Sequence, residues 1–347
     1  MQRKELGKTG IEVSVLCLGS MTWGSQNSEA EGHAQIDMSL DHGVDFIDTA
    51  EMYPVNPVKA ETIGRTEEII GTWVGKMGRR SDVVLATKHS GEGLGYVRDG
   101  APISSATISQ AIEGSLKRLQ TDYIDLYQFH WPNRGSYAFR KNWRYDPTAQ
   151  NKADTLAHME DALGALQREV EKGTIRSFGL SNESAWGTAQ WLRLSEAGAG
   201  PRVASVQNEY SLLYRLYDTD MAELGFNEDV DLLAYSPLST GLLTGKYQGG
   251  KVPKGSRLEL TGDLYGRKTD RAFAAVDAYV DVANKYGLDV TQMSLAWCLT
   301  RPFPCIPIFG ATSLKQLEVA LGTADITLSD DILDDLNAVH MAHPMTY

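Results

Sequence analysis

Residues 44–53 read Val44-Asp45-Phe46-Ile47-Asp48-Thr49-Ala50-Glu51-Met52-Tyr53. The apolar and β-branched residues in the first half predict a short buried strand that ends at Asp48. Pro54 and Pro57 follow and prevent a regular helix or central strand, so Tyr53 is expected in a loop just beyond the strand end. An acid and a phenol at such a place are a candidate acid–base pair. Taken alone, they also fit a helix-capping aspartate and a packed tyrosine.

A strand-then-helix pattern repeats on both sides of this run. Buried strands are predicted at residues 15–19, 44–48, 82–88, 123–130, 175–181, 203–207, 230–235 and 305–308. Helices are predicted at residues 29–41, 66–77, 103–119, 155–171, 184–195, 218–224, 269–286, 291–300 and 313–321.

Strands that alternate with helices pair in parallel, because each helical crossover returns the chain to the same end of the sheet. Eight such units, without a linker rich in proline and glycine, favour one α/β domain over residues 1–347, a single (β/α)8 TIM barrel. Alternating polar and apolar residues predict an N-terminal β-hairpin over residues 2–13. An open doubly wound sheet is the alternative, but no Gly-x-Gly-x-x-Gly turn follows the first strand.

Three segments are longer than ordinary loops, at residues 90–102, 131–154 and 238–267. Each follows the carboxyl end of a predicted strand, and barrel active sites lie at that face. The segment 131–154 is rich in aromatic residues and arginine. It is interpreted either as a solvated insertion with a small cluster of its own or as a lid that shapes a substrate pocket.

The composition limits the partners. The chain has 33 basic and 45 acidic residues and a net charge of −12, which argues against nucleic acids and anionic membranes as partners. The three scattered cysteines, Cys17, Cys298 and Cys305, have no metal-ligand spacing and indicate reduced thiols, and no metal is expected. Residues 1–5 lack the apolar run of a signal peptide, and no stretch has the ~20 apolar residues of a membrane span. We therefore expect a cytoplasmic protein.

Four polar groups gather at consecutive strand ends of the predicted barrel: Asp48, Tyr53, Lys88 and His130. A phenol has a reference pKa of about 10, and the ammonium group of Lys88 is expected to lower that of Tyr53. Asp48 would keep Lys88 charged, and His130 would hydrogen-bond a substrate oxygen that gathers negative charge. This set suits proton donation to a carbonyl group as a hydride reaches its carbon. Because no side chain supplies a hydride, a nicotinamide cofactor is implied.

Several long stretches carry a resemblance to a known family over essentially the whole chain: residues 18–24, 46–53, 115–126, 179–182, 207–213 and 235–238. The sequence resembles the aldo-keto reductase superfamily, and within it the bacterial Tas-type proteins and the reductases related to voltage-gated potassium channel β subunits. The resemblance implies a (β/α)8 barrel, NADPH binding without a glycine-rich fingerprint, and reduction of a small aldehyde or ketone. It implies that Tyr53 is the general acid, with Asp48, Lys88 and His130 as its catalytic partners.

The resemblance also implies cofactor contacts. Ser181, Asn182 and Gln207 match residues that hold the nicotinamide carboxamide, and Tyr235 matches the aromatic residue that stacks on the ring. Lys246 and Arg257 are candidate partners of the 2′-phosphate of NADPH. The remaining cofactor residues are Gly19, Ser20, Met21, Asp48, Ser236, Pro237, Leu238, Gly241, Leu243, Gly310, Thr312 and Gln316.

One departure from the family pattern lies in the last predicted helix. The family commonly has Glu and Asn where this chain has Val319 and Ala320, and those polar residues contact the adenine and its ribose. We therefore expect weaker adenine anchoring, or compensation by another residue. The substrate pocket is expected to include Trp23, Tyr53 and Trp131.

Two other functions stay open. One is an NADPH-binding, redox-sensing protein with slow turnover, which the resemblance to channel subunits allows. The other is a barrel hydrolase or metal enzyme, although no metal-ligand spacing supports it. The resemblance allows both monomers and rings, so an oligomer is possible, and the sequence does not name the substrate.

Overall fold

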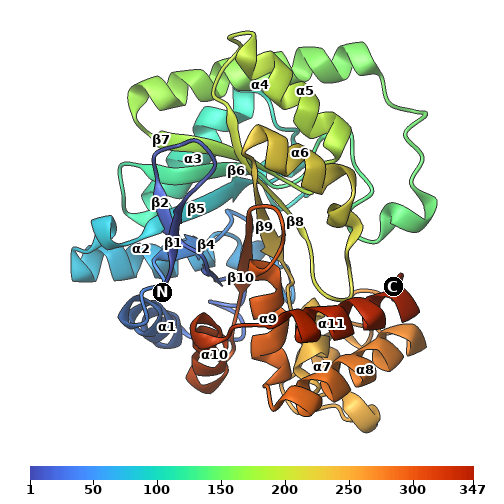
Figure 1. The fold of residues 1–347 in the computed structure, drawn as a ribbon. Coiled ribbons are helices and arrows are strands. Elements are labelled where there is room, and N and C mark those ends of the chain that lie inside the picture. Colours follow the sequence, from blue (N-terminus) through green and yellow to red (C-terminus); the bar gives the residue numbers. More distant parts are fainter.

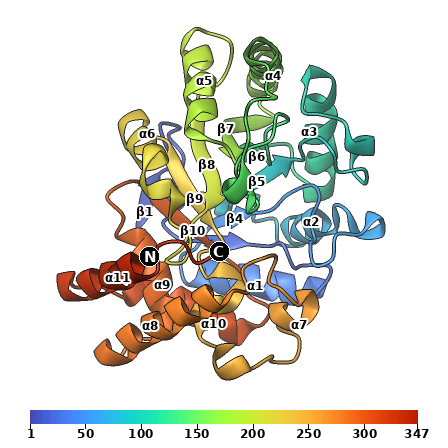
Figure 2. The ribbon, with the colours of Figure 1, turned by 90° about the vertical axis from the view of Figure 1, so that its right-hand side faces the viewer.

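Eight parallel strands close into a barrel in the computed structural model, which describes residues 1–347. The strand order is β10-β3-β4-β5-β6-β7-β8-β9, and the helices surround the strands (Figure 2). The predicted TIM barrel is therefore confirmed. The barrel strands are β3 (Cys17–Gly19), β4 (Phe46–Asp48), β5 (Val84–His89), β6 (Ile124–Phe129), β7 (Ile175–Ser181), β8 (Val203–Glu209), β9 (Asp231–Tyr235) and β10 (Cys305–Phe309).

Most helices lie within a few residues of their predicted positions. They are α1 (Glu29–Asp41), α2 (Arg65–Met77), α3 (Ser105–Leu119), α4 (Lys152–Lys172), α5 (Ala185–Glu196), α6 (Asp220–Glu228), α7 (Arg257–Thr261), α8 (Asp270–Tyr286), α9 (Val290–Leu299), α10 (Leu314–Leu321) and α11 (Asp330–Ala342). Helix α4 begins earlier than predicted because the Asn151 side chain accepts hydrogen bonds from the backbone of Ala153 and Asp154. The sequence pattern did not predict α7 or α11.

The predicted hairpin is present and closes the amino end of the barrel (Figure 1). It pairs β1 (Arg3–Glu5) with β2 (Glu12–Ser14), and Lys4 forms an ion pair with Asp231 at the start of β9. At Gly7 a Cβ atom would lie 2.6 Å from the carbonyl oxygen of Ala204, so only glycine allows this close approach.

The apolar residues form two main cores. A cluster of 68 buried residues fills the space between the strands and the surrounding helices. A second cluster of 11 buried residues lies inside the barrel, and the hairpin residues Leu6, Ile11 and Val13 belong to it. The polar strand ends are thereby left at the opposite, carboxyl end of the barrel.

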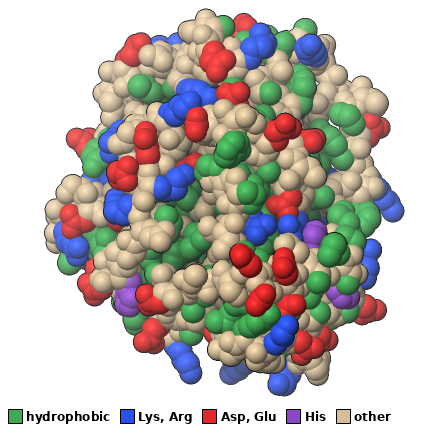
Figure 3. All heavy atoms as spheres, in the orientation of Figure 1, with side chains coloured by type: hydrophobic (Ala, Val, Ile, Leu, Met, Phe, Trp, Pro, Cys, Tyr) green, Lys and Arg blue, Asp and Glu red, His purple; other side chains and the backbone are tan.

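The three long segments lie at that carboxyl end, which is on the right in Figure 1 and faces the viewer in Figure 2. Acidic and basic side chains are interspersed over the face drawn in Figure 3. No helix is long and apolar enough to cross a membrane. No group of three or more His, Cys, Asp or Glu side chains is arranged to hold a metal ion.

The amino end of β6 carries a buried carboxylate on which two arginines converge. The side chain of Asp125 is 1% exposed and lies 2.7 Å from both Arg80 Nη2 and Arg176 Nη1. It also accepts the backbone N–H of Leu85 at 3.0 Å. This ionic cluster ties β5, β6 and β7 together.

Replacing this carboxylate is expected to destabilise the barrel. Asp125→Asn would remove the charge that both arginines face, and breaking a buried pair on one side costs about 3–5 kcal/mol. Denaturant unfolding should show this loss, whereas Asp122→Asn, at an exposed neighbouring position, should change stability by less than about 0.5 kcal/mol. Equal unfolding midpoints for the two variants would contradict the prediction.

Candidate active site

Lys88 is at the centre of the candidate site, and its ammonium group is enclosed by protein. Its Nζ donates hydrogen bonds to Asp48 Oδ2 at 2.6 Å and to the carbonyl oxygen of Thr49 at 2.7 Å. The side chains of Lys88 and Asp48 are 0% and 4% exposed, so water screens their attraction little. The structure thus brings together the acid of β4 and the base of β5.

Two amide side chains hold the second oxygen of Asp48. Gln128 Nε2 and Gln207 Nε2 donate to Asp48 Oδ1 at 3.1 Å and 2.8 Å, and Gln207 Nε2 also donates to Gln128 Oε1 at 3.1 Å. The sequence predicts Gln207 as a carboxamide contact and gives no role to Gln128. The spacing could have identified Gln128 as a site residue. It lies two residues before His130, and alternate residues of a strand share a face.

Asp48 keeps Lys88 protonated. Burial, the largest influence, lowers the pKa of this ammonium group, but Asp48, through its charge and its hydrogen bond, contributes most to the opposing effect, and the pKa lies above 10.5. Lys88 is therefore a cation at neutral pH.

Tyr53 lies just beyond β4, with Lys88 Nζ 5.1 Å from the centroid of its ring. Burial raises the pKa of the phenol above 10.0, and although Lys88 lowers it, burial has the larger effect. The predicted net lowering of this pKa is wrong, because the loss of hydration outweighs the nearby ammonium group. Tyr53 is consequently a neutral phenol that carries its proton at neutral pH.

His130 stands beside Tyr53, with the two ring centroids 5.8 Å apart. Burial and then the charge of Lys88 lower the pKa of this imidazole well below 6.5, so His130 is neutral. Its buried Nδ1 has no hydrogen-bond partner. Asn182 Nδ2 donates to the backbone oxygen of His130 at 2.8 Å, which fixes the backbone of this residue.

A second buried network, absent from the sequence predictions, begins two residues before Tyr53. Glu51 accepts two hydrogen bonds from Arg98, at 2.6 Å and 2.7 Å, and one from the backbone of Ser90 at 2.6 Å. Arg98 also lies 3.1 Å from His89 Nδ1. The segment 90–102 is thereby fastened to the chain that carries Tyr53.

An apolar wall flanks Tyr53 on the side of this segment. Ala50, Met52 and Val97 form a small buried cluster, against which Tyr53 and Trp131 pack. Trp131 Nε1 donates to the backbone oxygen of Glu92 at 3.1 Å. Trp131 is therefore held beside the candidate site, where the sequence predicted a pocket residue; Val55, Val58, Ile63 and Leu94 complete the wall.

Trp23 does not belong to this wall. Its side chain is 0% exposed, and its Nε1 donates to Gln35 Oε1 of α1 at 3.2 Å. A fully buried indole has no surface to offer a substrate. The predicted place of Trp23 in the substrate pocket is corrected accordingly, and Trp23 is a core residue between the barrel and α1.

Ser181 and Asn182, assigned to the carboxamide, form one hydrogen-bonded group with Tyr235, assigned to ring stacking, whereas the side chain of Gln207 faces Asp48 and only its backbone joins the group. Ser181 Oγ donates to the backbone oxygen of Gln207 at 2.8 Å, and Asn182 Nδ2 lies 3.1 Å from Ser181 Oγ. Tyr235 donates its hydroxyl hydrogen to Asn182 Oδ1 at 2.8 Å. The side chains of Ser181, Asn182 and Tyr235 are thus joined by hydrogen bonds.

The residues that follow β3 are organised around the backbone of β4. Ser20 Oγ donates to the carbonyl oxygen of Asp48 at 2.7 Å. At Gly19 a Cβ atom would lie 2.9 Å from Ile308 Cγ2 of β10, so glycine permits the close contact of β3 and β10. The carbonyl oxygen of Met21 accepts the N–H of Val55 at 3.0 Å.

The segment after β9 has an irregular backbone and holds two cations without acidic partners. Three residues other than glycine have positive φ between β9 and Arg257, namely Ser236, Ser239 and Thr240, as do five glycines that begin with Gly241. Leu243 is 0% exposed and Pro237 is buried, while Leu238 is half-buried. Burial and then the charge of Arg257 lower the pKa of Lys246, and burial is the largest influence that lowers the pKa of Arg257.

The last predicted cofactor group lies at the start of α10. Gln316 Oε1 accepts hydrogen bonds from Thr312 N at 3.0 Å and from Thr312 Oγ1 at 3.1 Å. Gly310 is exposed. Ala320 is 4% exposed and packs in the main core, and the carbonyl oxygen of Val319 accepts from Gln292 Nε2 at 3.0 Å. Position 320 thus faces the interior and would not present a longer polar side chain to solvent.

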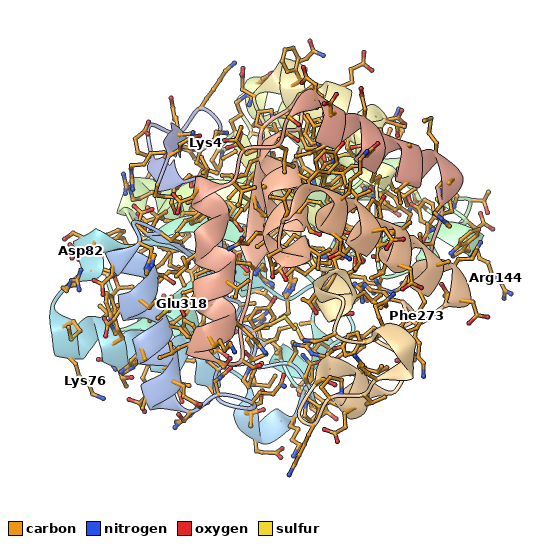
Figure 4. The ribbon with its side chains drawn as sticks, turned by 60° about the horizontal axis from the view of Figure 1, so that its bottom comes forward. Lys4, Lys76, Asp82, Arg144, Phe273 and Glu318 are labelled. Carbon is orange, nitrogen blue, oxygen red and sulfur yellow. The ribbon has the colours of Figure 1, made fainter.

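A cavity of about 1130 Å³ is lined by none of the four candidate residues Asp48, Tyr53, Lys88 and His130. It lies between β6, β7 and the starts of α3, α4 and α5, and residues of both the first and the second half of the segment 131–154 line it. Arg144 in the second half lies at the periphery of the molecule (Figure 4). The segment 131–154 therefore borders both this cavity and the candidate site, and only its first half approaches the latter.

Acid should destabilise the protein through the network of Glu51, Arg98 and His89. Burial lowers the pKa of His89 from 6.5 to about 4, so the unfolded chain takes up a proton first as the pH falls. This contribution is present above pH 6.5 and is lost between pH 6.5 and about 4, by an amount on the order of 3 kcal/mol. Across this pH range, the free energy of unfolding should fall less for His89→Gln than for the unaltered protein. For His42→Gln, at an exposed position, it should fall as much as for the unaltered protein. Identical pH profiles for the unaltered protein and His89→Gln would rule out this contribution.

Comparison with known proteins bears on the identity of the chain. The model of the aldo/keto reductase family matches residues 15–340. "Protein tas" of Escherichia coli (strain K12) is 42% identical, with 99% of each chain covered.

More distant relatives cover the chain equally well. "Probable voltage-gated potassium channel subunit beta" of Arabidopsis thaliana is 32% identical, over 99% of this chain and 98% of the relative. "Uncharacterized oxidoreductase YrpG" of Bacillus subtilis (strain 168) is 31% identical, over 98% and 96%. Together with the closed barrel and the polar strand ends, these matches support an oxidoreductase that uses a nicotinamide cofactor. The chain belongs to the aldo/keto reductase family.

Proposed function

We propose that the protein is an NADPH-dependent carbonyl reductase that acts on a small aldehyde or ketone. The observation that carries the proposal is the half-buried phenol of Tyr53 beside the enclosed ion pair of Lys88 and Asp48. NADPH, when bound, supplies the hydride; the residues of the chain supply the proton and the environment for the developing charge.

Tyr53 is proposed as the proton donor. Its phenol carries a proton at neutral pH because burial raises its pKa. As negative charge builds on a carbonyl oxygen that accepts this proton, the ammonium group of Lys88 stabilises the phenolate that is left behind. Asp48, held by Gln128 and Gln207, keeps that ammonium group charged and in place.

His130 is proposed as a neutral hydrogen-bonding partner of the same substrate oxygen. Its lowered pKa excludes an imidazolium that would compete as an acid with Tyr53. Trp131 and the apolar residues around Met52 would contact the rest of the substrate. This wall favours a carbonyl compound with an apolar or aromatic group.

The pair of Lys246 and Arg257 supports NADPH over NADH. Neither side chain has an acidic partner, and the pKa of Lys246 is lowered by burial and by Arg257. Two partly buried cations that repel each other favour a ligand with a dianionic group, such as the 2′-phosphate. We propose that Ser181, Asn182 and Tyr235 hold the nicotinamide end and that residues 236–246 and the start of α10 hold the phosphates.

Removing the phenolic hydroxyl should stop the chemistry without preventing binding. For Tyr53→Phe we expect turnover with a panel of aldehydes to fall by about 10²–10⁴-fold, while the dissociation constant for NADPH changes little. Tyr96→Phe, at an exposed tyrosine of the segment 90–102, is the matched control. Retained activity in Tyr53→Phe would overturn the assigned role. The same assay addresses the alternative of a redox-sensing protein, because NADPH binding without consumption by any aldehyde would favour it.

Neutralising the cation pair should weaken NADPH binding more than NADH binding. A hydrogen bond to a charged group contributes about 1.5–3 kcal/mol, so Lys246→Gln and Arg257→Gln should each raise the dissociation constant for NADPH by about tenfold or more. Fluorescence titration with both cofactors measures the ratio, and Lys251→Gln, at an exposed position of the same segment, should leave it unchanged. An equal effect on NADPH and NADH would contradict the assignment.

A further inference from the structure

Glu209, at the carboxyl end of β8, is the point where two long segments meet. Its Oε2 accepts from Arg140 Nη1 of the segment 131–154 at 2.7 Å. Its Oε1 accepts from Arg267 Nε at 2.7 Å, at the end of the long segment 238–267, here called the cofactor segment. Both oxygens are thus engaged by arginines that are distant in sequence. No sequence motif indicates this arrangement.

The contacts are shielded from water. The side chains of Glu209 and Arg267 are 4% and 3% exposed, and that of Arg140 is 18% exposed. Electrostatic attraction is strong at such depth, and a carboxylate that holds two arginines has a well-defined geometry. Breaking either contact leaves a buried charge less well paired.

Tyr347 adds a third element to the same point. Its hydroxyl oxygen lies 3.4 Å from Glu209 Oε1 and 2.9 Å from Ser239 Oγ. Ser239 belongs to the segment that is proposed to wrap the phosphates. Tyr347 is 3% exposed and its ring stacks on Tyr214, with centroids 5.7 Å apart. Glu209 is thereby joined to the cofactor segment at both Ser239 and Arg267.

Two further contacts hold the segment 131–154 over the nicotinamide side. Ser136 Oγ donates to the carbonyl oxygen of Asn182 at 2.6 Å, and residues 137–139 line one small space with Asn182 and Tyr235. Tyr235 is also the partner of Glu209 in the parallel register of β8 and β9. The first half of the segment therefore covers the residues proposed to hold the nicotinamide.

We propose that Glu209 is a positioning residue that fastens the segment 131–154 and the cofactor segment to each other, so that the two open together when the cofactor leaves. This inference rests on the proposed function, because it takes the residues around Tyr235 and Ser239 as the cofactor site. Glu209 and Arg140 influence the release of the cofactor indirectly, by holding the segment 131–154 and the cofactor segment in place. Arg140 on the segment 131–154 thereby controls the release of the cofactor that the cofactor segment holds.

The test is the rate at which NADPH dissociates, measured by stopped-flow fluorescence after mixing the NADPH-loaded protein with excess NADP. Arg140→Gln and Glu209→Gln should each raise this rate, within the range of about 5- to 150-fold that coupling between sites produces. The association rate should change by less than about threefold, because the open form binds as before. The double variant should dissociate no faster than Glu209→Gln, since both changes break one arrangement.

Arg80→Gln is the matched control, because it removes one of two arginines from buried Asp125 at the opposite end of the barrel. It should leave the dissociation rate unchanged even if it lowers the melting temperature. If Glu209→Gln does not fold, Arg140→Gln alone carries the test. A dissociation rate within twofold of the unaltered protein in folded Arg140→Gln would overturn the inference and leave the proposed function intact. Failure of the unaltered protein to bind NADPH would overturn both.

Discussion

The chemistry proposed for this barrel depends on an ion pair that water does not reach. Burying Lys88 and Asp48 costs several kcal/mol for each charge, and the cost is offset only if every charged atom has a partner. Those partners are the carbonyl oxygen of Thr49 and the amides of Gln128 and Gln207, which come from three places around the barrel. Only a closed barrel brings β4, β5, β6 and β8 to one point. The placement of the Lys88 cation therefore depends on closure of the sheet into a barrel.

The groups around that cation are neutral, and burial makes them so. Burial raises the pKa of Tyr53 and lowers that of His130, so a phenol and an imidazole both lack charge at neutral pH. Lys88 and Asp48 then balance each other, and the site has no net charge in its resting state. Negative charge that develops on a nearby oxygen would meet oriented donors and a fixed cation. Such preorganisation is the main source of electrostatic catalysis.

The sequence could predict what depends on local pattern. Strands, helices and the four polar strand ends follow from periodicity and from the rule that a barrel keeps its active groups at one face. It could not predict partners separated by long stretches of chain, such as Glu51 with Arg98 or Glu209 with Arg140. The prediction that Trp23 lines the substrate pocket was also wrong, because the sequence pattern of an aromatic residue after a strand is the same whether the residue faces a pocket or α1. The prediction of a lowered pKa for Tyr53 was wrong for a related reason, because the degree of burial depends on the tertiary structure.

The distribution of paired charges separates structural arginines from cations that remain available to a ligand. At the carboxyl face, Arg98, Arg134, Arg140 and Arg267 each form an ion pair with a buried carboxylate. Lys246 and Arg257 do not, although burial lowers the pKa of both. A partly buried cation without a partner lowers stability, and the other arginines of this face avoid that cost. The two cations without acidic partners lie in the segment after β9, whose irregular backbone also stores strain. An anion that binds there would relieve the repulsion between Lys246 and Arg257.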